Sequence, residues 1–322
     1  MLIFSTTSYE YLLDAIIKKQ NKHESDHLFL HKGEIKRSNF PDGESYHCFL
    51  SEISDQQVII IGGTISDSET LELYDMACHC AKAGARTITI IIPYYGYSTM
   101  ERAVKSGEIV KAKTRARLLS SIPFSFKLKI AFIDLHSEGI PHYLEGNIQP
   151  VHLYGKKVIM EMAKKISGVE NFVLASTDAG RAKWVESLAN DMKVDCAVIT
   201  KRRSSGSETE IVGINADVKD KIVVIYDDMI RTGGSLINAG TAYKNAGASK
   251  VYAIATHGIL PNDSIFKLKA SGVFEKVATT DTHPNANMLS GMPSLKEFYE
   301  VYSMDFILYK FCLNEIVILN YH

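Results

Sequence analysis

The chain has 322 residues, of which 46% are hydrophobic and 23% are charged, and this ordinary globular balance excludes a fibrous or disordered protein. Its 36 Lys and Arg residues nearly cancel its 37 Asp and Glu residues, so whole-chain charge gives no basis for a nucleic-acid or membrane partner. Five scattered cysteines, no signal-peptide pattern and no uncharged apolar run of about 18 residues predict a cytoplasmic protein with reduced thiols.

Short β-branched runs alternate along the chain with longer stretches of helical character. The runs lie at residues 57–61, 87–92, 130–133, 172–174, 196–199, 222–225 and 251–254. Apolar runs of this length are typical of strands that are buried on both faces, as in parallel sheets covered by helices. The predicted fold class is therefore α/β.

A weak internal repeat predicts two domains of the same fold. Ala83-Gly84-Ala85 precedes one predicted strand, and Ala246-Gly247-Ala248 precedes another; the offset from Gly84 to Gly247 is 163 residues. Each copy follows an apolar strand, a loop with paired glycines and a helix. We place the domains at 1–148 and 149–322, with the boundary in a loop-rich stretch between Gly146 and Gly155. Chance likeness remains the alternative, because Ala-Gly-Ala is common between a helix and a strand.

The segment from Val223 to Ser235 carries the strongest functional signal. Asp227 and Asp228 follow a buried strand, at the end where α/β sheets bind ligands, and paired carboxylates suit ribose hydroxyls or Mg²⁺. Thr232-Gly233-Gly234-Ser235 then opens a helix, whose backbone N–H groups and flanking hydroxyls suit a phosphate. The alternative is structural, with an acid that caps a helix and glycines that turn the chain.

This segment resembles the phosphoribosyl-diphosphate loop that phosphoribosyltransferases share with ribose-phosphate pyrophosphokinases. Other segments, in the same order, are similar to successive pyrophosphokinase motifs: Phe40-Pro41-Asp42-Gly43-Glu44, Pro93-Tyr94-Tyr95-Gly96-Tyr97, Asp134-Leu135-His136, Ser176-Thr177-Asp178-Ala179-Gly180 and Lys201-Arg202-Arg203. The resemblance extends to Asp281-Thr282. It implies two tandem type I phosphoribosyltransferase-like domains, each with a central, mainly parallel sheet flanked by helices.

The resemblance also implies an activity, a cofactor and a set of site residues. The family transfers the β,γ-diphosphate of ATP to the anomeric hydroxyl of ribose 5-phosphate with Mg²⁺ and releases AMP. Lys201 and Arg203 would be catalytic, His136 and Asp178 would hold the metal, and Ser204 to Thr209 would form a mobile loop that closes over ATP. Residues expected to bind ATP are Phe40, Asp42, Glu44, Arg102 and His136. Residues expected to bind the acceptor are Asp227, Asp228, Arg231, Thr232, Gly233, Gly234 and Ser235.

The family's loop at positions like Phe40 to Glu44 reaches the ATP of a neighbouring subunit. This implies a homo-oligomer, a dimer or a hexamer, whose ATP site is shared across an interface. A plain turn is the alternative, because Pro-Asp-Gly predicts one well.

Two segments depart from the family pattern. Thr99-Met100 stand where the family has Arg-Gln that help to hold ATP, and Arg231 stands where it has Asp; Ser235 also replaces the common threonine. An added guanidinium can grip a second phosphate, which suggests an acceptor with a 5′ diphosphate such as ADP-ribose. Equally, Arg231 could point to solvent while the acceptor remains ribose 5-phosphate.

Two rival functions stay open at this point. One is a phosphoribosyltransferase that consumes the activated sugar, and the other is a non-catalytic regulatory paralogue of the synthetase. The run from Phe298 to Ile318 is predicted to be helical and apolar enough to pack on a core or on a partner.

Overall fold

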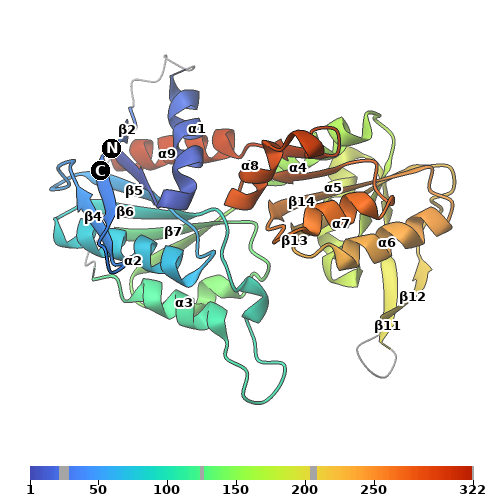
Figure 1. The fold of residues 1–322 in the computed structure, drawn as a ribbon, viewed down its shortest axis with the longest axis horizontal. Coiled ribbons are helices and arrows are strands. Elements are labelled where there is room, and N and C mark those ends of the chain that lie inside the picture. The colour runs from blue at the N-terminus through green and yellow to red at the C-terminus, as the bar shows by residue number, and fades with distance from the viewer. Residues whose placement is uncertain (22–28, 124–126, 204–208, 321–322) are drawn as a thin grey trace. The chain divides into compact units, whose positions relative to one another are not determined.

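The structure is a computed structural model that describes residues 1–21, 29–123, 127–203 and 209–320, without the side chains of 201–203, 209–212 and 316–320. Packing divides the chain into two compact units (Figure 1). Unit 1 comprises Met1–Leu153 and Asp305–His322, and unit 2 comprises Tyr154–Met304.

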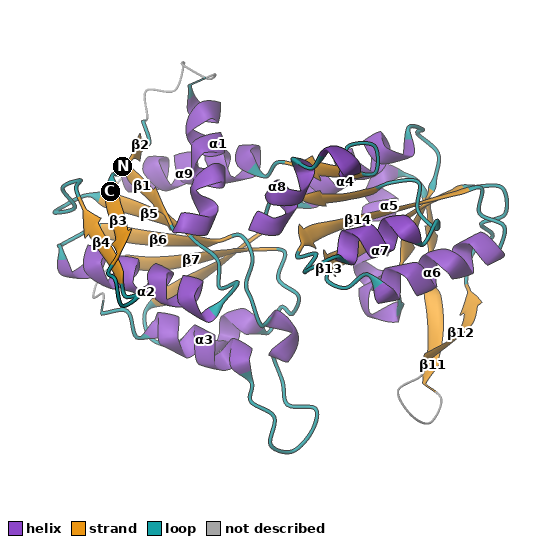
Figure 2. Ribbon diagram, viewed as in Figure 1, coloured by secondary structure: helices purple, strands orange, loops and turns teal. Residues whose placement is uncertain are grey.

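Unit 1 is built on a parallel six-stranded sheet of order β2-β1-β5-β6-β7-β8. Helices α2 and α3 pack on one face, and α1 and α9 lie on the other (Figure 2). The strands are β1 (Leu2–Ser5), β2 (His31–Lys32), β5 (Gln57–Ile61), β6 (Thr87–Ile92), β7 (Lys127–Ile133) and β8 (Ile148–Leu153). The helices are α1 (Glu10–Gln20), α2 (Asp67–Lys82), α3 (Lys111–Ser120) and α9 (Asp305–Asn320).

Unit 2 is built on a second parallel six-stranded sheet, of order β10-β9-β13-β14-β15-β16. Helices α4 and α5 bury their apolar side chains against one face, while α6, α7 and α8 cover the other. The strands are β9 (Val173–Ser176), β10 (Asp195–Ala197), β13 (Ile222–Ile230), β14 (Lys250–Gly258), β15 (Val277–Thr280) and β16 (Tyr299–Tyr302). The helices are α4 (Lys156–Ser167), α5 (Ala182–Met192), α6 (Gly234–Asn245), α7 (Ser264–Ala270) and α8 (Pro284–Ser290).

The two units repeat one topology, which confirms the predicted fold of two like domains. In each sheet the second strand lies at an edge beside the first, and a hairpin follows it in sequence before the third. These hairpins are β3–β4 (Ile35–Asn39, Ser45–Phe49) and β11–β12 (Ile199–Arg203, Thr209–Ile214). Gly84 and Gly247 both have positive φ, 81° and 94°, where a helix ends before a strand. Glycine suits this left-handed cap because it has no Cβ.

The expected domain boundary falls within an element that the sequence did not suggest. Residues 148–153 form β8 rather than a loop, and Pro150 is tolerated there because β8 is an edge strand. By packing, the chain divides at Leu153, and the C-terminal helix α9 groups with unit 1. The division into domains at 148/149 stays a prediction.

The C-terminal run is only partly helical. Residues Tyr299–Tyr302 form β16, and α9 begins at Asp305. Leu308, Tyr309 and Cys312 of α9 are completely buried within unit 1. The helix therefore packs on its own chain's core, which answers the question that the sequence left open.

A buried ion pair fixes α9 against the sheet of unit 1. Lys129 Nζ of β7 lies 2.6 Å from both carboxylate oxygens of Glu315, and Thr89 Oγ1 of β6 donates to Glu315 Oε2 at 3.3 Å. The Lys129 and Glu315 side chains are only 7% and 6% exposed. Two charges removed from water in this way depend on each other for compensation.

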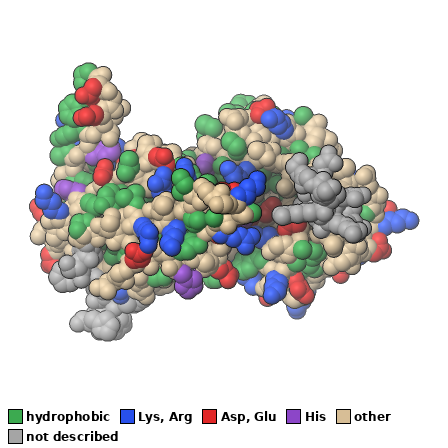
Figure 3. Space-filling view, turned by 90° about the horizontal axis from the view of Figure 1, so that it is seen from below, with side chains coloured by type: hydrophobic (Ala, Val, Ile, Leu, Met, Phe, Trp, Pro, Cys, Tyr) green, Lys and Arg blue, Asp and Glu red, His purple; other side chains and the backbone are tan. Residues whose placement is uncertain are grey.

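Within the described parts of the chain, no helix is both long enough and apolar enough to cross a membrane. On the face shown in Figure 3, acidic and basic side chains are both spread over the surface, as the near-zero net charge leads one to expect.

Candidate functional site

The acid pair of unit 2 lies within a strand rather than after one. The pairing of β13 with β14 continues past Ile225, through Asp227 opposite Ala255, to Ile230 opposite Gly258. The predicted strand at 222–225 was therefore too short, because Asp227 and Asp228 interrupt its apolar pattern but not its backbone pairing. Both carboxylates still lie in the carboxyl-terminal half of β13.

The loop that follows β9 engages both carboxylates. Thr177 Oγ1 donates to Asp227 Oδ2 at 3.2 Å, and Arg181 Nη2 lies 2.6 Å from Asp228 Oδ2. The backbone N–H of Asp228 also donates to Asp227 Oδ1 at 2.9 Å. The Asp228 side chain is 5% exposed and that of Arg181 22%. A guanidinium beside a buried carboxylate offsets part of the cost of its burial and holds it in one orientation.

Burial, followed by the neighbouring charge of Asp228, raises the pKa of Asp227 from 3.8 to about 8. A carboxyl that is costly to ionise has a reason to take up a hydroxyl donor or a cation, since either stabilises its charged form. The two side chains of the pair therefore differ: Asp228 is held by an ion pair with Arg181, and Asp227 has a raised pKa.

Replacing Asp227 by Asn should stabilise the fold at alkaline pH while abolishing acceptor use. Between pH 4 and 8 the folded chain holds a proton that the unfolded chain has lost, so the free energy of unfolding of the wild type falls as pH rises through this range. The amide of the Asp227→Asn variant does not titrate and would carry no such dependence. Urea titrations at pH 5 and pH 8 measure the free energy of unfolding of both proteins. A variant that is less stable than the wild type at pH 8 would contradict the predicted stabilisation.

The segment after β13 has the geometry of an anion site. Gly233 has φ 80° and directly precedes α6, and a Cβ there would lie 2.8 Å from the Leu268 side chain, so any other residue would be strained at this position. Arg231, Thr232, Gly234 and Ser235 are exposed around it. The first turn of a helix leaves backbone N–H groups without intrahelical acceptors and carries partial positive charge. The loop is therefore accessible from solvent, and its role in phosphate binding stays a prediction.

Asp178 lies in the same loop as Thr177 and Arg181, directly before a short 3-10 helix (Ala179–Arg181). Its Oδ1 accepts a hydrogen bond from the Gly180 backbone N–H at 2.9 Å. The expected role of Asp178 as a metal ligand remains a prediction. The sequence analysis gave no role to Thr177, which lies in the Ser176–Gly180 motif, or to Arg181, although their position after a buried strand was a usable signal.

Lys201 and Arg203 lie on β11, opposite Ile211 and Thr209 of β12, with an irregular register between Thr200 and Lys201. Their side chains are outside the described part of the structure, so their catalytic roles stay predictions. Of the expected closing loop, residues 204–208 also lie outside the described residues, and Thr209 begins β12.

In unit 1, His136 lies in the loop after β7 and is half-buried. Two residues before it, Asp134 has φ 38°, a conformation that is costly for a residue with a side chain. The backbone N–H of Leu135 donates to His152 Nε2 at 3.3 Å. The chain therefore turns sharply at the carboxyl end of β7. The hydrogen bond to His152 connects this turn, which precedes His136, to β8.

Phe40 to Glu44 form the exposed tip of the β3–β4 hairpin. The Phe40 N–H donates to the Glu44 carbonyl at 2.8 Å, and Gly43 adopts φ 94°. Phe40 is 50% exposed and packs edge-on against Tyr46, with ring centroids 5.8 Å apart. The motif thus forms the turn that Pro-Asp-Gly predicts. At the same time it projects a large aromatic ring and two carboxylates, those of Asp42 and Glu44, into solvent.

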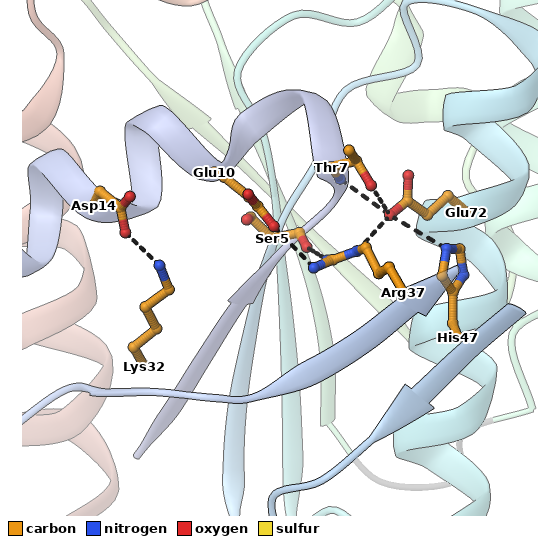
Figure 4. Close-up of polar contacts among 8 residues, drawn as sticks. All are labelled: Ser5, Thr7, Glu10, Asp14, Lys32, Arg37, His47 and Glu72. Atoms are coloured by element: carbon orange, nitrogen blue, oxygen red, sulfur yellow. Dashed lines mark hydrogen bonds and ion pairs between the residues drawn. The ribbon is translucent and has the colours of Figure 1, made fainter. Parts of the chain in front are cut away.

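A polar cluster anchors the middle of this hairpin (Figure 4). Arg37 of β3 donates from Nε to Glu72 of α2 at 3.3 Å, and from Nη1 to Glu10 of α1 at 2.9 Å. Glu72 also accepts from the backbone N–H and the hydroxyl of Thr7 at 3.0 and 2.9 Å, and His47 Nε2 lies 3.9 Å away. Arg37 and His47 are paired across the hairpin, so both of its strands are held and the tip has a defined direction.

The two positions that depart from the family pattern after β6 are at the surface. Thr99 and Met100 lie in a short 3-10 helix (Ser98–Met100), and both are exposed. Arg102 follows, with an Nε to Glu101 Oε1 distance of 3.6 Å and a side chain that is 79% exposed. Arg102 is therefore accessible to a nucleotide, as its assigned role requires.

Among the described residues, no group of three or more His, Cys, Asp or Glu side chains could hold a metal ion by itself. Mg²⁺ is commonly held by one or two carboxylates together with substrate phosphates and water, and it prefers oxygen to imidazole nitrogen. The carboxylate of Asp178 is a donor of this kind, whereas the imidazole of His136 suits Mg²⁺ less well.

Comparison with known proteins gives concordant results. Residues 1–122 match a family model for the N-terminal domain of ribose phosphate pyrophosphokinase, and residues 206–296 match one for a phosphoribosyl synthetase-associated domain. The chain is 35% identical over 250 residues to a ribose-phosphate pyrophosphokinase of Chlorobaculum tepidum, covering 77% of this chain and 76% of the relative. It is 33% identical over 275 residues to ribose-phosphate pyrophosphokinase A of Dictyostelium discoideum, covering 84% of each.

A solved structure shares the whole fold. The phosphoribosylpyrophosphate synthetase from Mycobacterium smegmatis covers 96% of this chain, and 96% of its own chain is covered, with a TM-score of 0.78 and 24% identity. At this identity the likeness shows the fold, with two similar domains in one chain.

Proposed function

Since this chain belongs to the ribose-phosphate pyrophosphokinase family, we propose that it is an active enzyme that transfers the β,γ-diphosphate of ATP to the anomeric hydroxyl of a 5-phosphorylated ribose. The products are AMP and a ribose that carries a 1-diphosphate. Its site residues are those assigned above, with Lys201 and Arg203 in the catalytic role.

The observation that best supports this function is the arrangement around β13. Two carboxylates lie on the strand, one anchored by Arg181 and the other costly to ionise. A glycine with φ 80°, where a side chain would be strained, leads from the same strand into the N-terminus of α6. Carboxylates accept hydrogen bonds from vicinal hydroxyls, and a helix N-terminus binds phosphate. A 5-phosphorylated ribose presents both groups on one small molecule.

The chemistry is an in-line displacement at the β-phosphorus of ATP. The anomeric oxygen forms the new bond to phosphorus and loses its proton, while the bond from the β-phosphorus to the α-phosphate oxygen breaks and AMP leaves. The protein's task is to position both substrates and to place positive charge where negative charge develops. Mg²⁺, when bound, neutralises phosphate charge, and Lys201 and Arg203 supply the fixed cations.

Arg231 is the residue that distinguishes two possible acceptors. It is exposed beside the anion loop, so its guanidinium is accessible to a second phosphate. Ribose 5-phosphate needs only the α6 N-terminus, whereas ADP-ribose would use Arg231 as well. We take ribose 5-phosphate as the acceptor and treat ADP-ribose as the alternative that this residue favours.

The test is to incubate the purified protein with ATP and Mg²⁺, alone or with either acceptor, and to measure AMP by chromatography. We expect AMP release that requires ribose 5-phosphate. Release with ADP-ribose alone, lost in an Arg231→Asp variant, would establish the extended acceptor instead. No release with either acceptor would overturn the proposal and favour a regulatory paralogue, and consumption of phosphoribosyl diphosphate without ATP would indicate a phosphoribosyltransferase.

A further inference from the structure

Tyr97 of unit 1 is flanked by two cations from helix α3. The Lys111 ammonium lies 4.7 Å from the centroid of the Tyr97 ring, and the guanidinium carbon of Arg115 lies 5.1 Å from it. Both distances are within the range in which a cation is attracted to the face of an aromatic ring. Tyr97 itself has φ 60°, a left-handed conformation that is uncommon for a residue with a side chain. A ring held in this way serves as a platform for both cations.

One carboxylate balances only part of this charge. Asp67 Oδ1 accepts from the Tyr97 hydroxyl at 2.6 Å and from Arg115 Nη2 at 2.5 Å. Within the described residues, no carboxylate oxygen lies within 4.0 Å of the Lys111 ammonium. The segment from Ser98 to Ser120 as a whole contains six Lys or Arg residues and two Glu. This cluster therefore keeps a net positive charge in a chain whose charges otherwise nearly cancel.

The cluster lies at the edge of the sheet where ligands bind. Tyr97 is in the loop after β6, and Asp67 begins α2, which follows β5. Lys111 begins α3, the helix that runs back before β7. Loops after parallel strands meet at one edge, so these residues share the carboxyl edge of unit 1 with the His136 loop. Tyr97, Lys111 and Arg115 are half-buried, so the cations are partly shielded from water but still accessible.

We propose that Lys111 and Arg115, held against Tyr97, bind a phosphate group at the carboxyl edge of the unit 1 sheet. The ammonium offers three donors and the guanidinium a planar set, which together suit the several oxygens of one phosphate. The group can come from the polyphosphate chain of the nucleotide or from free inorganic phosphate. Binding of the nucleotide phosphate rests on the proposed function, whereas binding of inorganic phosphate does not.

Isothermal titration calorimetry with a non-hydrolysable ATP analogue plus Mg²⁺, and separately with inorganic phosphate, tests this assignment. Lys111→Gln removes one charge-assisted contact, so affinity for the ligand that uses the site should fall about tenfold or more. Lys113→Gln is the matched control. It removes the same charge from the same helix, but Lys113 lies over Tyr143, 5.8 Å from that ring's centroid, and should change affinity by less than about twofold.

The outcomes separate the sources. Weaker binding of the analogue alone places nucleotide phosphate at the cluster, and weaker binding of inorganic phosphate alone places the free anion there. Unchanged affinity for both in Lys111→Gln and in a second variant, Tyr97→Leu, would overturn the assignment. Because the titration needs no turnover, a wild type that releases no AMP but binds phosphate through Lys111 would refute only the proposed function.

Discussion

Replacing Lys201 by Ala should lower kcat for acceptor-dependent AMP release by about a hundredfold to a thousandfold, the usual cost of removing one preorganised donor to a developing negative charge. The KM values for ATP and the acceptor should change far less, because this interaction strengthens only in the transition state. Steady-state kinetics with ATP, Mg²⁺ and ribose 5-phosphate measures both parameters.

Two further variants make this result specific to the charge of Lys201. Lys201→Met keeps the aliphatic stem on β11 and should lose as much activity as Lys201→Ala. Lys250→Ala removes an exposed lysine at the amino end of β14, away from the site edge of the same sheet, and should leave kcat unchanged. If Lys201→Ala retained wild-type kcat with an unchanged unfolding midpoint, its catalytic assignment would be wrong.

The largest effect on stability is expected from Glu315→Ala. This change leaves the Lys129 ammonium, whose side chain is 7% exposed, without its partner on α9. Breaking a buried ion pair from one side typically costs about 3–5 kcal/mol, because the remaining charge is neither solvated nor paired. Urea unfolding followed by circular dichroism should therefore show a clear loss of stability in unit 1.

A double variant separates the ion pair from the packing of α9. Lys129→Met combined with Glu315→Leu removes both charges and fills a similar volume, so it should recover most of the lost stability. The matched control is Lys19→Ala, which breaks the ion pair between Lys19 and Asp305 of the same helix, 3.4 Å apart and partly exposed. It should cost no more than about 1 kcal/mol. Equal losses in Glu315→Ala and Lys19→Ala would show that burial does not set the cost.

The sequence by itself determined the class of fold and pointed to most residues of the proposed acceptor site. Uninterrupted apolar runs predicted β5 and β6 with their observed bounds, because a strand buried on both faces has no reason to alternate. The pair Asp227-Asp228 and the glycine at 233 could be recognised in the sequence for a similar reason. Backbone geometry at a strand end and at a helix N-terminus restricts residue types locally, and local restrictions leave a pattern in sequence.

Only the tertiary structure decided which distant residues meet. Arg181 pairs with Asp228, Lys111 lies over Tyr97, and Glu315 reaches Lys129 across 186 residues of sequence. The strand length of β13 and the packing of α9 on unit 1 were decided in the same way. Such pairings depend on how helices and strands pack in space. The residues next to one partner in the sequence give no information about the identity of the other partner. The sequence therefore indicated the candidate site, while the fold decided which charged side chains surround it.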